Sequence, residues 1–200
     1  DTDRSRGLGD VYKRQVLCTS NPHQTGDMNM EIQLVLPEES QAEDLALQRN
    51  DREVVRYTGD PKYPYTKEDA LADIRSFLEE ENKSRVTRTI LADGRPIGIV
   101  YFYLPWRGQK SVELGYWIGK QYWGQGISTY AAKQLCDFAF RTLDINRICA
   151  SALEVNVGSW RVMEKLGMRR EGTFIKAIYQ NGEFFNDLYY AVLREEYSME

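Results

Sequence analysis

The feature that most constrains the fold is a glycine-containing segment, Gln121 to Ser128. The extended run Ser111 to Ile118 precedes it, and Ser128 to Arg141 follows with apolar residues at three- and four-residue spacing. These periods predict a strand, a loop and a helix. The first N–H groups of a helix have no intrahelical partner, and glycines let the loop backbone approach a ligand. The segment therefore indicates an anion site, with an ordinary glycine turn as the alternative interpretation.

Two common phosphate-binding loops do not fit this segment. A Walker loop has four residues between its glycines and a hydroxyl residue after its lysine, whereas Gly115 to Lys120 is one residue short and Gln121 follows. A dinucleotide fingerprint needs a third glycine where Thr129 stands. It also needs further strand–helix units, but the chain after Gly126 ends in a hairpin pattern.

The rest of the pattern predicts a mixed α/β domain. Asp93-Gly94 and Asn181-Gly182 are typical of tight hairpin turns, and the runs from Arg88 to Ile118 form an antiparallel meander. Thr66 and Asp69 resemble a capping box, and Asn156 and Gly167 suit the two ends of a short helix. Further helices are expected at 41–56, 66–81 and 157–166, and further strands at 31–36, 88–92, 96–104, 147–155, 172–179 and 184–193.

Residues 1–27 show no periodic pattern, and the first 15 resemble a translated sequencing adapter. We expect 1–27 to be a non-native or disordered segment and 28–200 to be one domain, with Met28 or Met30 as a natural start. A chain of 200 residues with 42% apolar content is within the size of one domain.

Charge and composition exclude several classes. The net charge of -4 gives no basic surplus for a nucleic-acid partner, and no apolar run approaches the length of about 18 residues that a membrane span needs. Cys18, Cys136 and Cys149 lack metal-ligand spacing, which favours reduced thiols and a cytoplasmic location. The one histidine, His23, lies in the uncertain N-terminal segment, so neither a Ser-His-Asp triad nor a histidine metal site is expected.

Gln121, Gly124 and Gly126 form the pattern Q-x-x-G-x-G, which resembles the pyrophosphate-binding motif of the GNAT superfamily of N-acetyltransferases. The resemblance extends from about Ile32 to Tyr197. It is nearest to the RimJ/RimL-like branch, which acetylates the N-termini of ribosomal proteins. Four further segments carry it in order: Glu113–Ile118, Asn156–Gly167, Glu171–Thr173 and Leu193–Tyr197.

The resemblance implies a largely antiparallel central sheet that is split in the middle and flanked by helices. Acetyl-CoA is then the cosubstrate and no metal is involved. The pantetheine arm lies in the split against the strand edge, and Asn156 bonds its amide. The cofactor-binding residues implied are Trp117, Ile118, Gly119, Gln121, Trp123, Gly124, Gln125, Gly126, Ile127, Ser128, Asn156, Ser159 and Lys165.

Glu113 is the candidate general base. An amine of pKa about 8 to 10 is mostly protonated at pH 7, so its proton must be removed before it attacks a thioester. Alternation along the strand places Glu113 on the face opposite Leu114, Tyr116 and Ile118. The alternative is a structural carboxylate that bonds a neighbouring residue.

Ser159 is the candidate acid for the departing thiolate. Many family members use a tyrosine in the pattern Tyr-x-Lys-x-Gly, but Met163 stands at that position here. Ser159 lies four residues earlier and so on the same helix face, and relatives in this branch carry a serine there. Water as the proton source, with Ser159 as an ordinary first-turn residue, is the alternative.

The expected function is transfer of acetyl from acetyl-CoA to a primary amine, most plausibly a protein N-terminal α-amine. A small-molecule amine acetyltransferase and a non-catalytic acyl-CoA sensor are the alternatives, and the oligomeric state is open. Thirteen acidic and six basic residues between Glu38 and Glu81 favour a cationic acceptor. The aromatic candidates for the acceptor pocket are Tyr65, Tyr101, Tyr103 and Trp106, although core packing is the favoured interpretation of these residues.

Overall fold

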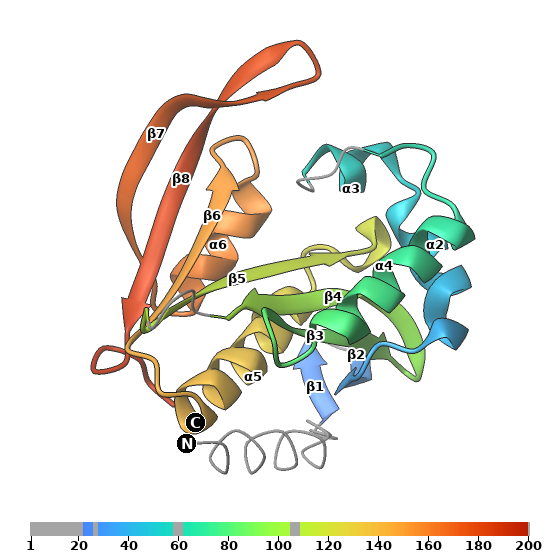
Figure 1. The fold of residues 1–200 in the computed structure, drawn as a ribbon, viewed down its shortest axis with the longest axis horizontal. Helices are drawn as coiled ribbons and strands as arrows, with labels where there is room; N and C mark the ends of the chain where they lie inside the picture. The colour runs from blue at the N-terminus through green and yellow to red at the C-terminus, as the bar shows by residue number, and fades with distance from the viewer. Residues whose placement is uncertain (1–21, 26–27, 58–61, 105–108, 200) are drawn as a thin grey trace.

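The computed structural model describes residues 22–25, 28–57, 62–104 and 109–199, and Figure 1 shows their arrangement. The strands are β1 (Pro22–Thr25), β2 (Met28–Val35), β3 (Arg85–Ala92), β4 (Arg95–Tyr103), β5 (Ser111–Ile118), β6 (Arg147–Leu153), β7 (Arg169–Gln180) and β8 (Glu183–Leu193). The helices are η1 (Glu39–Gln41), α2 (Ala42–Arg49), α3 (Arg52–Arg56), α4 (Lys67–Glu80), η2 (Lys120–Tyr122), α5 (Ile127–Thr142) and α6 (Val157–Lys165).

The described strands form one mixed sheet in the order β1-β2-β3-β4-β5-β6-β8-β7. All neighbouring pairs are antiparallel except β5 and β6, which are parallel. The expected meander from β3 to β5 and the expected C-terminal hairpin of β7 and β8 are both present. The mixed α/β class and the largely antiparallel sheet are confirmed.

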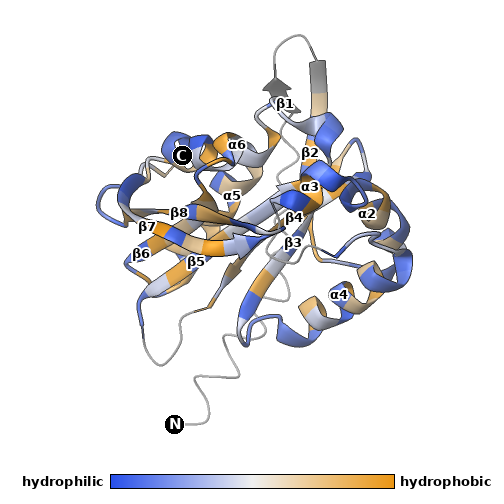
Figure 2. Ribbon diagram, turned by 90° about the horizontal axis from the view of Figure 1, so that it is seen from above, coloured by the Kyte–Doolittle hydropathy of each residue, from blue (hydrophilic) through white to orange (hydrophobic). Residues whose placement is uncertain are grey.

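Helices cover both faces of the sheet. On one face, α5 packs its buried Ala131, Leu135 and Ala139 against Leu114 and Ile118 of β5 in the main core. On the other face, α2 and α4 form a second cluster with Ile99 of β4, to which Tyr101 and Trp117 add partly buried rings. Figure 2 shows the amphipathic pattern of α4, whose apolar positions Ala70 and Ile74 are buried. Alternate residues of β4 and β5 thus enter different cores, as the period of a strand requires.

The local signals behave as their chemistry predicts. Thr66 and Asp69 form a capping box at the start of α4. Asn181 and Gly182 have φ of 53° and 85°, the left-handed values of a tight hairpin turn. The helical stretch expected over 41–56 is divided, because Asp51 accepts from the backbone of Glu53 at 2.8 Å and starts α3 as a separate helix.

Two sequence expectations concern residues beyond these ranges. Trp106 and the first 21 residues lie outside the described part of the chain. Within the described part, no helix combines the length and the apolar character needed to cross a membrane.

The backbone of β5 passes close to Gly98 of β4. A Cβ at this position would lie 2.2 Å from the carbonyl oxygen of Trp117, a backbone atom that cannot swing away. We predict that Gly98→Ala lowers the Tm by about 2–12 °C, because overpacking costs about 1–3 kcal/mol and each kcal/mol shifts a domain of this size by about 2–4 °C.

The matched control is Gly172→Ala, since a Cβ on Gly172 would meet no described atom within 4 Å. Its Tm should stay within about 2 °C of wild type in the same thermal melts. Equal stability of the two variants would contradict the close packing of β4 on β5.

Candidate active site

The central feature of the site is the separation of β5 from β6. The two strands pair only through Ser111, Val112 and Glu113, which face Arg147, Ile148 and Cys149. Beyond Glu113 the register ends, and Figure 1 shows the two strands diverging from this point. The split expected from the family resemblance is therefore present, with Glu113 at its apex.

Beyond the apex, β5 turns one backbone edge toward the split. The N–H of Gly119 donates to the carbonyl of Ile97 at 2.8 Å, on the β4 side. Since successive residues of a strand direct their backbone groups to opposite edges, the N–H and carbonyl of Ile118 point into the split. The indole N–H of Trp123 already donates to that carbonyl at 3.0 Å. The N–H of Ile118 therefore points to the place where a ligand in the split would lie.

The glycine loop ends at the N-terminus of α5. Gly124 and Gly126 have φ of 75° and 78°, and Gly126 is the N-cap, so no side chain caps the first turn. A Cβ on Gly124 would meet no described atom within 4 Å. The first N–H groups of this 16-residue helix therefore suit a phosphate, since the helix dipole adds partial positive charge there.

Side chains from the loop and from α2 and α3 fix its shape. The side-chain amide of Gln125 donates to the carbonyl of Gln121 at 2.8 Å, and among the described residues its buried Oε1 has no partner. Gln121 donates in turn to Gln48 at 3.4 Å, and Lys120 pairs with Glu53 at 2.9 Å. The unpaired Gln125 oxygen is a ready acceptor for a ligand N–H or O–H, so the loop fits a polar cosubstrate.

Glu113 has two ionisable neighbours on β8, Asp187 and Tyr189, that the sequence did not predict. Burial raises the pKa of Glu113 above its ordinary value, and the carboxylate of Asp187 on β8 raises it further. Burial likewise raises the pKa of Asp187, while a hydrogen bond to Ser151 opposes that shift. The pKa of Tyr189 is raised by burial and by both carboxylates. Strand register places Asp187 and Tyr189 on the same face as Glu113. Cys149 of β6 pairs with both Glu113 and Ala191, so Tyr189, opposite Ser151, lies two positions further along the sheet and Asp187, opposite Leu153, lies four.

Ser159 lies in the first turn of α6, on the opposite side of β5. Asn156 caps this helix by accepting from the Ser159 N–H at 3.3 Å, as its N-cap role predicts. The hydroxyl of Tyr116 donates to the Ser159 carbonyl at 2.8 Å and lies 3.2 Å from its Oγ. Because Tyr116 has one proton, Ser159 Oγ–H is the donor in the second contact. Met163 is buried in the main core, and Lys165 is exposed at the last turn of α6.

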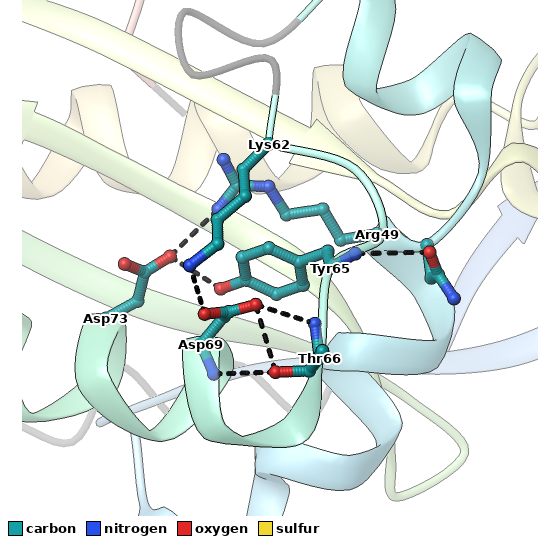
Figure 3. A network of polar contacts seen from close by, with 7 residues as sticks. Arg49, Lys62, Tyr65, Thr66, Asp69 and Asp73 are labelled. Atoms are coloured by element: carbon teal, nitrogen blue, oxygen red, sulfur yellow. Dashed lines mark hydrogen bonds and ion pairs between the residues drawn. The ribbon is translucent and has the colours of Figure 1, made fainter.

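Six of the thirteen acidic residues between Glu38 and Glu81 form ion pairs in the described part of the chain, four with bases of the same segment and two with Arg88 and Lys120. Figure 3 shows Asp73 of α4 accepting from Arg49 at 2.9 Å and from Tyr65 at 2.5 Å, and Asp69 paired with Lys62. Further pairs join Glu39 to Arg75, Glu43 to Lys67, Glu53 to Lys120 and Glu81 to Arg88. The expected attraction of this segment for a cationic acceptor stays a prediction.

The aromatic candidates separate into two groups. Tyr65 is buried under Arg49 and bonded to Asp73, so it belongs to the α2–α4 core. Tyr101 lies across β5, because a Cβ on Gly115 would come within 2.3 Å of its ring. Tyr103 remains exposed and is the register partner of Glu113. Only Tyr103 and Tyr101 thus adjoin the apex.

Comparison with known proteins agrees with this geometry. Residues 31–169 match the family profile described as an acetyltransferase (GNAT) domain. The uncharacterised N-acetyltransferase YnaD of Bacillus subtilis is 32% identical over 74% of this chain and 85% of its own length. Spermidine N(1)-acetyltransferase of Escherichia coli is 24% identical over 76% and 80%. The solved structure of RimL, a ribosomal L7/L12 α-N-protein acetyltransferase in complex with coenzyme A, superposes with a TM-score of 0.75 at 21% identity, covering 85% and 96%.

These matches cover well over half of the chain, so the protein belongs to the GNAT acetyltransferase family. It is accordingly an acetyl-CoA-dependent acyltransferase. RimL at this identity supports the shared fold alone.

The raised pKa of Asp187 yields a prediction about stability. A carboxyl whose pKa is raised in the folded state destabilises the fold once it is ionised, so stability is lost as the pH rises from the unfolded pKa through the folded one. We predict that Asp187→Asn raises the Tm at pH 7 by about 2 °C or more.

The gain should shrink as the pH falls toward about 4, where the wild-type carboxyl also becomes neutral. Thermal melts of both proteins across this range measure it. A variant that is less stable at pH 7 would show that Asp187 is held mainly by its hydrogen bond to Ser151.

Proposed function

We propose that this acyltransferase moves acetyl from acetyl-CoA to a primary amine, with a protein N-terminal α-amine as the acceptor. The observation that carries the proposal is the apex of the split, where Glu113 lies between an open strand edge and the face occupied by Asp187 and Tyr189. A thioester beside the edge and an amine on that face would meet at the carboxylate.

The cosubstrate would be held by backbone more than by side chains. The uncapped N-terminus of α5 and the loop from Gln121 to Gly126 suit the pyrophosphate, and the edge from Trp117 to Gly119 suits the pantetheine. Trp123, Gln125, Ile127, Ser128, Asn156, Ser159 and Lys165 complete the proposed contacts. Acetyl-CoA supplies the activated acetyl group, and the protein supplies orientation and proton transfer.

Glu113 would accept a proton from the bound ammonium, directly or through water. Its raised pKa makes it a stronger base than an exposed glutamate. Transfer would then be direct: the amine nitrogen would bond to the acetyl carbon, the carbon–sulfur bond would break, the nitrogen would lose its second proton to water, and the thiolate would take up a proton. The N–H of Ile118 is placed to stabilise negative charge on the acetyl oxygen.

The thiolate proton would come from water or from Ser159. Ser159 Oγ–H is directed at Tyr116 in the structure, so it must rotate before it can bond sulfur. The pKa of Tyr116 is itself raised by burial, which keeps its hydroxyl protonated and able to hold α6 in place. We therefore assign Ser159 a hydrogen bond to sulfur and assign the proton to water.

The acceptor class rests on two relatives that point in different directions. RimL acts on a protein α-amine, and the spermidine enzyme acts on a polyamine. A small-molecule acceptor is therefore the alternative, and a sensor that binds acyl-CoA without turnover is the other. A thiol-release assay with an amine panel separates them, since a sensor would bind coenzyme A and release no thiol.

Coenzyme A binding tests the loop assignment. We predict that Gly126→Asn weakens binding at least about tenfold in calorimetry. Asparagine tolerates the left-handed φ of 78°, but its side chain would cap the α5 N–H groups and fill the space beside them.

Gly182→Asn is the control, because Gly182 also has a left-handed φ, of 85°, and lies at the hairpin tip. Its affinity should equal that of wild type. Unchanged affinity in Gly126→Asn would remove this loop from the cofactor site.

Glu113→Gln tests the base. We predict a loss in kcat/KM of about 10²- to 10⁴-fold near neutral pH, the usual contribution of a general base. The loss should diminish as the pH rises, because the free amine becomes abundant without assistance. Profiles of both enzymes from about pH 6 to 10 measure it, and a constant ratio at every pH would make Glu113 structural.

A further inference from the structure

The face of the sheet that carries Glu113 continues onto the β7–β8 hairpin. Asp187 and Tyr189 lie two residues apart on β8, so they share this face, and their β7 partners are Phe174 and Gly172. The rings of Phe174 and Tyr189 meet edge to face at 4.7 Å, which agrees with the register. Phe174 is thus placed next to the carboxylate pair, not on the far side of the hairpin.

This face combines apolar surface with negative charge. The side chain of Phe174 is 53% exposed, and Ile178, the partner of Phe185, extends the apolar surface toward the hairpin tip. Asp187 is only 8% exposed, and its burial and that of Glu113 raise the pKa of both groups. Among the described residues, no lysine or arginine forms an ion pair with either carboxylate.

Phe174 is exposed beside two carboxylates that lack a cation, so a ligand that fits this face carries both a positive charge and an apolar group. A buried carboxylate is stabilised by a cation, and exposed apolar surface by an apolar group. An unsubstituted polyamine would satisfy the charge, but its thin methylene chain, flanked by charged nitrogens, would cover Phe174 less completely than a branched or aromatic side chain. A neutral apolar molecule would cover Phe174 and leave both carboxylates without a cation.

We propose that the acceptor carries an apolar side chain next to its amine, with the nitrogen held between Glu113 and Asp187 and the side chain packed on Phe174 and Tyr189. The proposal rests on the acetyl transfer argued above and narrows its substrate class. An N-terminal residue with a leucine- or phenylalanine-like side chain has this shape. In this arrangement Asp187 binds the ammonium and Phe174 selects the side chain.

The opposite face of the same hairpin provides a matched control. Tyr179 and Phe184 form their own ring pair at 4.8 Å, and they are 64% and 62% exposed. They lie on the side of β8 that carries Leu188 and Tyr190 into the main core, away from Glu113. Phe184→Ser therefore removes as much exposed apolar surface as Phe174→Ser without touching the proposed acceptor face.

The experiment measures thiol release with glycinamide, alaninamide, leucinamide and phenylalaninamide, which present the same α-amine beside different side chains. Wild type should favour the two large amides over glycinamide about tenfold or more in kcat/KM, mainly through KM. Phe174→Ser should reduce this preference to about twofold, and Phe184→Ser should retain it. Asp187→Asn should raise KM for all four amides by a similar factor, because it acts on the ammonium.

Each contrary result has a separate meaning. If the protein binds coenzyme A but releases no thiol with any amide or with spermidine, the proposed function fails. Equal kcat/KM for all four amides, or equal effects of the two serine variants, would overturn the selectivity and leave acetyl transfer intact. A change of sedimentation coefficient in Phe174→Ser without a change in KM would also overturn it, by making this surface a contact between copies of the chain.

Discussion

The site depends on a backbone constraint, the end of β5–β6 pairing at Glu113. Backbone donors and acceptors away from water need partners, so an interrupted pair in the middle of a sheet is costly unless something else is bonded there. The interruption is held by packing on each side. β4 and β5 are fixed by α2 and α5, whereas β6 and β8 are fixed by α6. The edge of β5 is therefore rigid before any ligand arrives, which lowers the entropy lost on binding.

Local signals in the sequence predicted the elements well. The cap at Thr66, the turn at Asn181-Gly182 and the caps of α6 each depend on residues within a few positions, and each is present. The split was expected from the resemblance to a family and not from periodicity. Strand pairing depends on contacts distant in sequence, so no local pattern reports where β5 leaves β6.

The candidate site was predictable only in part for the same reason. Glu113 and the loop from Gln121 to Gly126 follow one another in the chain, and the sequence could offer both as candidates. Asp187 and Tyr189 are more than seventy positions from Glu113, and they reach it only because β8 pairs with β6 in a particular register. A slip of one residue along β8 would turn Asp187 from the face of Glu113 toward the core. Composition likewise indicated an acidic region between Glu38 and Glu81, but it could not show that six of its carboxylates form ion pairs, two of them with Arg88 and Lys120.

The treatment of charge differs between the scaffold and the site. Arg88, nearly fully buried, is paired with Glu81 at 2.8 Å, and buried Arg49, which lies over the ring of Tyr65, is paired with Asp73. Such partners are what an interior charge requires. No described lysine or arginine pairs with Glu113 or Asp187, and burial raises the pKa of both carboxyl groups, so their ionised forms destabilise the fold. Under the proposed function, an ammonium bound beside them would relieve this cost.

Strand β5 presents different groups to different sides, because successive residues of a strand alternate between its two faces. From β5, Glu113 points to the acceptor face, Tyr116 points to the other face and holds Ser159, and the backbone of Ile118 points into the split. A shift of one residue would exchange the faces and remove both groups from their partners. Gly115 allows the ring of Tyr101 to pack across β5, because a Cβ at this position would lie 2.3 Å from the ring Cζ. Tyr101 thus contacts β5 between Glu113 and Ile118, so its packing bears on both the proposed base and the proposed cofactor edge.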